Sequence, residues 1–247
     1  MPELSISQWI GAALCALLIG FSKTGVPGSG ILVIPLFAEI LPARASTGAL
    51  LPMLIMADVF AVAYYRRHAV WRHLVHLLPW AVVGVVLGAF GLKHVSDLQL
   101  RKIIGAVVLV MLALNYVWNR FRDPDAPIPA HWLFAASFGL VAGVVTMMAN
   151  AAGPVMVIYL LAMRLPKNEF IGTGAWYFLL INCIKVPFHI LVVGTITGPS
   201  LLFSAAFLPV ITIGALLGVK VAQRIPEKLF NNLVQILAAV AALKLIF

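Results

Sequence analysis

The sequence predicts an all-α polytopic membrane protein made of two inverted repeats with five segments each. Of the 247 residues, 63% are hydrophobic and only 10% are charged, and the mean hydropathy is +1.06. The apolar residues gather in ten runs, and polar, proline and glycine positions of the first half recur in the second. Because so few charges cannot cover a water-soluble fold, the bilayer is the expected solvent.

The lengths of the apolar runs separate full crossings from short segments. They fall at residues 5–22, 29–41, 45–65, 74–92, 100–119, 132–149, 153–163, 169–193, 199–219 and 229–246. A helix needs about 20 residues to cross the hydrocarbon core. The second and seventh runs are too short, so we predict that each is a half-helix returning beside the run before it. Each repeat is therefore expected to be a half-helix hairpin followed by three transmembrane helices.

The two repeats are expected to form a single transmembrane domain, 1–247, in which a linker at 120–130 joins repeat one (5–119) to repeat two (131–247). An offset of 124 residues aligns Ser22 with Thr146, Pro42 with Pro166, Gly48 with Gly172, and Asp58 with Asn182. An offset of 130 then aligns "PWAVVGVVLG" (79–88) with "PVITIGALLG" (209–218). An odd number of segments in each repeat inverts the second relative to the first.

The basic residues orient the chain. The net charge of +9 does not indicate nucleic acid, because lysine and arginine lie in short breaks between apolar runs. The hairpin arrangement puts ten of them on one side: Arg66, Arg67, Arg72, Arg120, Arg122, Arg164, Lys167, Lys220, Arg224 and Lys228. Five lie on the other side: Arg44, Lys93, Arg101, Lys102 and Lys244. The positive-inside rule then predicts a bacterial inner-membrane protein with a cytoplasmic linker and both termini in the periplasm.

Cofactors and macromolecular partners other than lipid are not predicted. Cys15 and Cys183 lie within apolar runs, which favours buried thiols over a disulfide or a metal site. The chain has no phosphate-binding loop, so direct coupling to ATP is not expected. The expected partners are a small anionic substrate and the lipid bilayer, with no nucleic acid; homo-oligomerisation is left open.

Two proline- and glycine-rich breaks, "VPGSG" (26–30) and "ANAAGP" (149–154), mark a candidate anion site. Broken backbone at membrane depth is tolerated only where it lines a cavity, and the amino terminus of the following helix attracts anions. Buried lysines would add full charges there. The candidate substrate-binding residues are Ser22, Lys23, Thr24, Gly28, Ser29, Gly30, Thr146, Asn150, Gly153, Asn182 and Lys185.

The charged candidates each have an alternative interpretation. Lys23 and Lys185 could extend to an interface instead of binding substrate. Asp58 could bind a coupling proton or form an ion pair with either lysine. His189 shares a helix face with Asn182 and Lys185, which favours a pore lining and a proton-coupling role, although a histidine near a helix end is often structural.

The stretch "GFSKTGVPGSGILVIPLFAEILPARASTGALLPMLIMADVFAVAYYRR" (20–67) resembles the sulfite exporter TauE/SafE family, also called the toluene-sulfonate uptake permeases. Its pattern is Gly-x-Ser-Lys-x-Gly-x-Pro-Gly, followed by Pro35, Pro42, Gly48, Pro52 and Asp58 and then by Tyr65 and the basic loop to Trp71. The resemblance covers essentially the whole chain, although "TMMANAAGP" in the second half is a looser match that keeps Asn150 and Gly153. It implies a polytopic inner-membrane protein that moves sulfite or organosulfonates.

The leading hypothesis is therefore a secondary transporter, an exporter of small sulfur oxyanions, that works by alternating access with its site between the two hairpins. A passive anion channel shares the same electrostatic argument and remains the alternative. A serine–histidine intramembrane protease using Ser29 and His189 is the enzymatic alternative. The duplication argues against it, because a catalytic dyad needs no second break and Gly153 takes the place of Ser29 in the second half.

Overall fold

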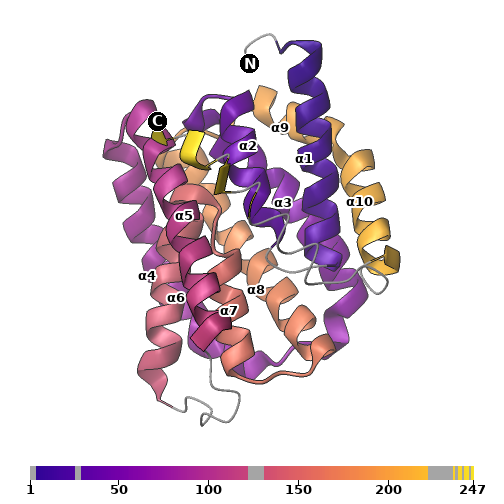
Figure 1. Cartoon of the computed structure of the whole chain (residues 1–247), viewed down its shortest axis with the longest axis vertical. Helices are drawn as coiled ribbons and strands as arrows, with labels where there is room; N and C mark the ends of the chain where they lie inside the picture. The colour runs from indigo at the N-terminus through magenta and orange to yellow at the C-terminus, as the bar shows by residue number, and fades with distance from the viewer. Residues whose placement is uncertain are drawn as a thin grey trace.

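The computed structural model describes residues 4–25, 29–121, 131–221, 236, 239–240, 242–244 and 246–247, and across these it is a bundle of helices without strands (Figure 1). The helices of the first half are α1 (Ile6–Thr24), α2 (Val33–Ile40), α3 (Ala43–Tyr65), α4 (Trp71–His94) and α5 (Asp97–Phe121). Those of the second half are α6 (Trp132–Ala149), α7 (Gly153–Ala162), α8 (Lys167–Pro187), α9 (Gly198–Ala206) and α10 (Leu208–Val221). Short 3-10 turns, Ser29–Leu32 and Arg66–His68, precede α2 and α4, and one π-helical turn, Phe188–Val192, extends α8.

Helix length and composition confirm the predicted all-helical, multi-pass fold. In the part of the chain described, α1, α3, α4, α5, α6 and α8 are long and apolar enough to cross a membrane. The second and seventh segments are short, as predicted: α2 has 8 residues and α7 has 10. The predicted last run, 229–246, lies mostly outside the described residues.

The predicted run 199–219 is not one helix. It divides at Phe207 into α9 and α10, whose axes differ by 46°. Pro209 supplies the physical reason, because it has no N–H to donate to the carbonyl of Ala205 and its ring crowds that carbonyl. The two helices together account for one further span.

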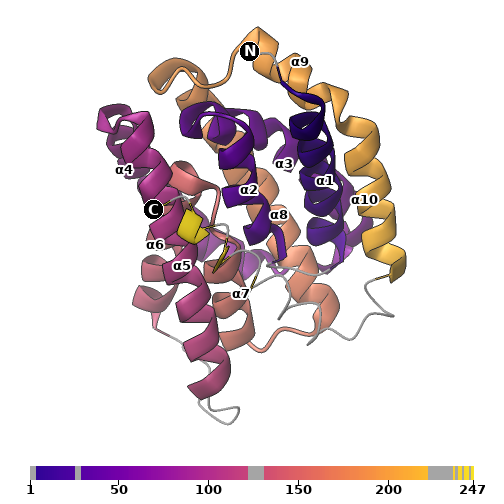
Figure 2. The same ribbon diagram turned by 45° about the horizontal axis from the view of Figure 1, so that its top comes forward.

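Among the close contacts that join the halves, two helix pairs depend on glycine. Helix α1 packs along α10, where a Cβ on Gly20 would lie 2.1 Å from the Ile211 carbonyl oxygen. Helix α6 packs along α4, where a Cβ on Gly143 would lie 2.1 Å from the Ala81 carbonyl oxygen. Both pairs run side by side in Figures 1 and 2. Such small residues let backbones approach where no hydrophobic force drives helices together in lipid.

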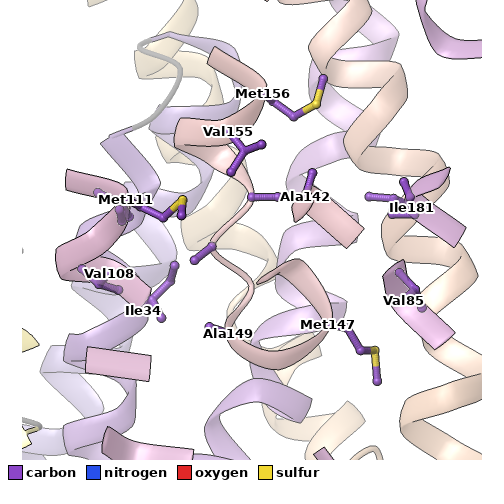
Figure 3. Packing of buried hydrophobic residues seen from close by; sticks show 14 of the residues in the cluster. Ile34, Val85, Val108, Met111, Ala142, Met147, Ala149, Val155, Met156 and Ile181 are labelled. Atoms are coloured by element: carbon purple, nitrogen blue, oxygen red, sulfur yellow. The ribbon is translucent and has the colours of Figure 1, made fainter. Parts of the chain in front are cut away.

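The larger apolar core also draws on both halves. In Figure 3, Ile34 of α2 lies beside Val108 and Met111 of α5, while Val155 and Met156 of α7 lie near Ala142 of α6. All of these side chains are buried. The two short helices are thus held by packing against full-length helices.

Polar contacts identify the two ends of the bundle. The Gln8 amide donates to the Ile40 carbonyl at 3.2 Å, and the Lys244 ammonium lies 2.9 Å from a Glu39 carboxylate oxygen. Both ends of the chain therefore lie at the end of the bundle where α3 begins. The 66–70 turn lies at the opposite end, where the Val70 N–H donates to the Thr173 hydroxyl at 2.9 Å.

Candidate functional site

A cavity of about 90 Å³ lies between the two halves. Residues from α1, α2 and α3 line it from the first half, and residues from α6, α7 and α8 line it from the second. Most of the lining side chains are apolar. The polar side chains on its wall are Ser22, Lys23, Thr146, Asn150 and Asn182.

Matching stripes of α3 and α8 form two walls of the cavity. Leu50 and Leu54 line it from α3, and Gly174 and Phe178, which follow them by 124 residues, line it from α8. Asn182 continues the α8 stripe one turn further on, at the spacing of a single helix face. Its counterpart Asp58 is fully buried and does not line the cavity.

Lys23 faces the cavity from the last turn of α1. Its ammonium lies 2.8 Å from Asp58 Oδ1 and 3.9 Å from the centre of the Phe178 ring. The side chain of Lys23 is 14% exposed and that of Asp58 is 0% exposed. The carboxyl end of a helix, an anionic partner and an aromatic face all favour a cation here. Lys23 therefore reaches the cavity wall, where it pairs with Asp58.

Lys185 lies deeper than Lys23. It is fully buried and is absent from the cavity wall. Its ammonium donates to Thr146 Oγ1 at 3.1 Å, to Asn150 Oδ1 at 2.6 Å and to Asn182 Oδ1 at 3.1 Å. All three acceptors are neutral oxygens from residues that do line the cavity.

Asn182 connects the two charged parts of the site. Its Oδ1 accepts from Lys185, and its Nδ2 donates to Asp58 Oδ2 at 2.7 Å. A chain of polar contacts thus runs from Lys23 through Asp58 and Asn182 to Lys185. The aligned positions Asp58 and Asn182 touch one another in the fold.

The break in the second half brings Asn150 to the cavity. Asn150 ends α6 in the left-handed conformation, with φ +54°, which asparagine tolerates better than most residues. Its Nδ2 donates to the Thr47 carbonyl of α3 at 3.2 Å. Helix α7 then begins at Gly153, and both Gly153 and Pro154 line the cavity, so the amino terminus of α7 borders it.

The break in the first half is only partly described. Gly30 lines the cavity, and Ser29 is buried in the 3-10 turn before α2 and is not part of the wall. The candidate Gly28 lies outside the described residues. Thr24 faces α10 instead, because its hydroxyl lies 2.7 Å from the Ala215 carbonyl. The structure therefore separates Thr24 from its neighbours Ser22 and Lys23.

His189 is fully buried in the π-helical turn, away from the cavity wall. Its Nδ1 lies 2.7 Å from the Thr195 hydroxyl, and its Nε2 has no hydrogen-bond partner among the described residues. Of the three residues expected to line a pore together, Asn182 reaches the cavity, whereas Lys185 and His189 do not.

Comparison with known proteins identifies the family to which this chain belongs. Residues 12–245 match the family described as Sulfite exporter TauE/SafE, which is nearly the whole chain. The chain belongs to this family. TauE/SafE proteins are membrane transporters and not enzymes, which removes the intramembrane protease alternative. Neither the curated proteins nor the solved structures gave a match.

The sequence prediction missed an aromatic side chain on the cavity wall of this TauE/SafE protein. Phe178 lies under the Lys23 ammonium and on the cavity wall. Two signals were present: Phe178 precedes Asn182 by one helical turn, and it follows Leu54 by the repeat offset. One phenylalanine in an apolar helix does not differ visibly from its neighbours in the sequence, and its contact with a cation becomes evident only in the fold.

Proposed function

We propose that this protein is a secondary transporter that exports small sulfur oxyanions, such as sulfite or organosulfonates, across the bacterial inner membrane. The observation that carries the proposal is a cationic side chain, Lys23, which is the only one that the described residues place on the wall of a mostly apolar cavity between the halves of a TauE/SafE chain. A cavity needs about 10–15 Å³ of volume to hold one water molecule, so about 90 Å³ leaves room for a solute of a few heavy atoms.

The anion is held by Lys23, by the polar side chains Ser22, Thr146, Asn150 and Asn182, and by backbone at Gly30 and Gly153. Helix α7 contributes the positive end of its dipole at Gly153. A charge-assisted hydrogen bond from Lys23 is worth roughly 1.5–3 kcal/mol. The remaining candidates, Thr24, Ser29 and Lys185, support the site without lining its wall.

Alternating access follows from an inverted-repeat arrangement of residues 5–119 and 131–247. Five pairs of cavity-lining positions separated by 124 residues support it: Ser22 and Thr146, Gly30 and Pro154, Val33 and Val157, Leu50 and Gly174, and Leu54 and Phe178. The paired glycine contacts of α1 with α10 and of α6 with α4 support it as well. Rocking one repeat against the other would then open the site to each side in turn.

The basic end of the bundle, with the 66–72 loop and the linker, faces the cytoplasm in this proposal, and both chain ends face the periplasm. The contacts that put both chain ends beside the start of α3 support this arrangement. The positive-inside rule then selects the compartment.

Asp58 is the candidate for a coupling proton. An anion that draws Lys23 away would leave a buried carboxylate whose one remaining partner among the described residues is the Asn182 amide, and such a charge favours taking up a proton. Proton flux into proteoliposomes during sulfite transport, followed with a trapped pH dye, tests this role. Transport that carries no protons, or the same proton flux in Asp58→Asn, would rule it out.

The decisive experiment is flux in proteoliposomes with sulfite, sulfoacetate, taurine, thiosulfate and sulfate. The proposal expects saturable flux of at least one of these sulfur anions, together with counterflow when the opposite side is preloaded. Flux that neither saturates nor shows counterflow would instead indicate an anion channel. The absence of flux for all five compounds would refute the proposal.

A further inference from the structure

Lys185 is a fully buried cation, and all of its hydrogen-bond donors are in use. An ammonium has three N–H donors and no acceptor. Its three hydrogen bonds, to Thr146, Asn150 and Asn182, account for all three donors. Because its side chain is fully buried and off the cavity wall, Lys185 has neither a donor nor a surface to offer a substrate.

Its contacts instead fix the orientation of two amides. A donor-only ammonium requires Oδ1 of Asn150 and of Asn182 to face it. The other end of each amide is fixed independently, since Nδ2 of Asn182 meets the acceptor-only Asp58 carboxylate and Nδ2 of Asn150 meets the Thr47 carbonyl. Neither amide can flip without placing donor against donor or acceptor against acceptor.

We propose that Lys185 is a positioning residue that makes the cavity selective for anions by turning the N–H groups of Asn150 and Asn182 toward the substrate. Each Nδ2 carries two hydrogens, and its hydrogen bond within the described part of the chain uses one, so one donor on each amide remains. Both residues line the cavity, as Lys23 does. This inference rests on the proposed function and deepens it.

The consequence is a defined class of ligand. With both carbonyl oxygens held by Lys185, the amides present only donors, and Lys23 adds a cationic donor. Such a site suits an oxyanion with at least two acceptor oxygens, as in sulfite or a sulfonate group. It disfavours cations and amines, which would find no free acceptor from these three residues.

Two neutral substitutions separate positioning from charge. Lys185→Gln and Lys185→Met both remove the positive charge, but glutamine keeps an NH2 group that can donate to the asparagine oxygens. We expect Lys185→Met to weaken sulfite binding to the purified protein, measured calorimetrically without oxygen, at least tenfold more than Lys185→Gln does. In transport, the difference should appear in KM and not in kcat. If Lys185 acts through its charge, the two variants lose equal affinity, and that result would overturn the proposal.

A further variant keeps the proposal testable if Lys185→Met does not fold. Asn182→Leu leaves the ammonium in place and removes one amide, so we expect at least a tenfold loss of sulfite affinity; unchanged affinity would overturn the proposal. Lys102→Gln, at an exposed lysine of α5, is the matched control and should bind like the wild type. A wild type that binds no sulfite would refute the proposed function and this inference with it, whereas a wild type that binds, with equally impaired Lys185 variants, would refute only the role of Lys185.

Discussion

Removing Lys23 is expected to affect stability and transport by separate routes, and a second substitution distinguishes them. In Lys23→Met, Asp58 stays fully buried with its charge and loses the ammonium 2.8 Å away. In the double variant with Asp58→Asn, the buried charge is gone as well. The stability lost in the first variant should therefore return in the second, whereas transport should not.

The expected magnitudes follow from the burial of the pair. Breaking a buried ion pair by removing one partner costs about 3–5 kcal/mol, and the Asn182 hydrogen bond that remains places this case toward the lower figure. In transport, the bound anion loses a charge-assisted hydrogen bond from Lys23 worth roughly 1.5–3 kcal/mol, which corresponds to about tenfold to a hundredfold in affinity for the anion. That second loss applies equally to the single and the double variant.

The measurements are unfolding of the purified protein in detergent and sulfite flux in proteoliposomes, for the two single variants and the double variant. Lys102→Met, at an exposed lysine, is the control for removing a lysine and should change neither quantity. Recovery of transport in the double variant would refute the assignment of Lys23 to the anion site, because it would mean that Lys23 serves only to neutralise Asp58.

Further predictions concern topology, packing and the second break. With the native cysteines replaced, Arg67→Cys should react with an impermeant thiol reagent only after the membrane is opened. Gly198→Cys should react in intact cells, since a Cβ added at Gly198 meets nothing within 4 Å. The reverse pattern would invert the topology. Gly143→Ala should cost about 1–3 kcal/mol of stability through overpacking against α4. The control Gly174→Ala should fold normally, because its Cβ meets only a leucine methyl at 3.5 Å. Equal stability of the two variants would contradict the close contact at Gly143. Asn150→Gly keeps the left-handed backbone but loses the amide, so it should fold and show a raised KM for sulfite; an unchanged KM would exclude that amide from the site.

The sequence predicted the helices well because particular residue types mark where each helix ends. Charged residues, proline and glycine interrupt the apolar runs, and each interruption costs free energy in lipid wherever backbone or charge is left unpartnered. The starts of α6 and α7 were predicted to the residue. A bend at Pro209 was expected, but not its size: a proline in a membrane helix can either bend it or be absorbed by it, and packing decides the 46° between α9 and α10.

The candidate residues were recognisable, but their roles were not. Lys23, Asp58, Asn182 and Lys185 drew attention because polar groups are expensive at membrane depth. Either lysine could have paired with Asp58, and only the fold shows that Lys23 does so while Lys185 bonds to neutral oxygens. Pairing depends on distances between helices, which a single sequence does not contain.

By itself, the sequence determined that this chain is a helical membrane protein with two broken segments and a small set of costly polar residues. The tertiary structure alone decided which side of each helix faces the cavity. Ser22 and Thr24 illustrate the reason: they lie on nearly opposite faces of α1, one on the cavity wall and the other against α10. In a soluble protein the apolar stripe would have identified the inner face. In a bilayer, lipid and protein core are equally apolar, so the pattern that orients a soluble helix is missing here.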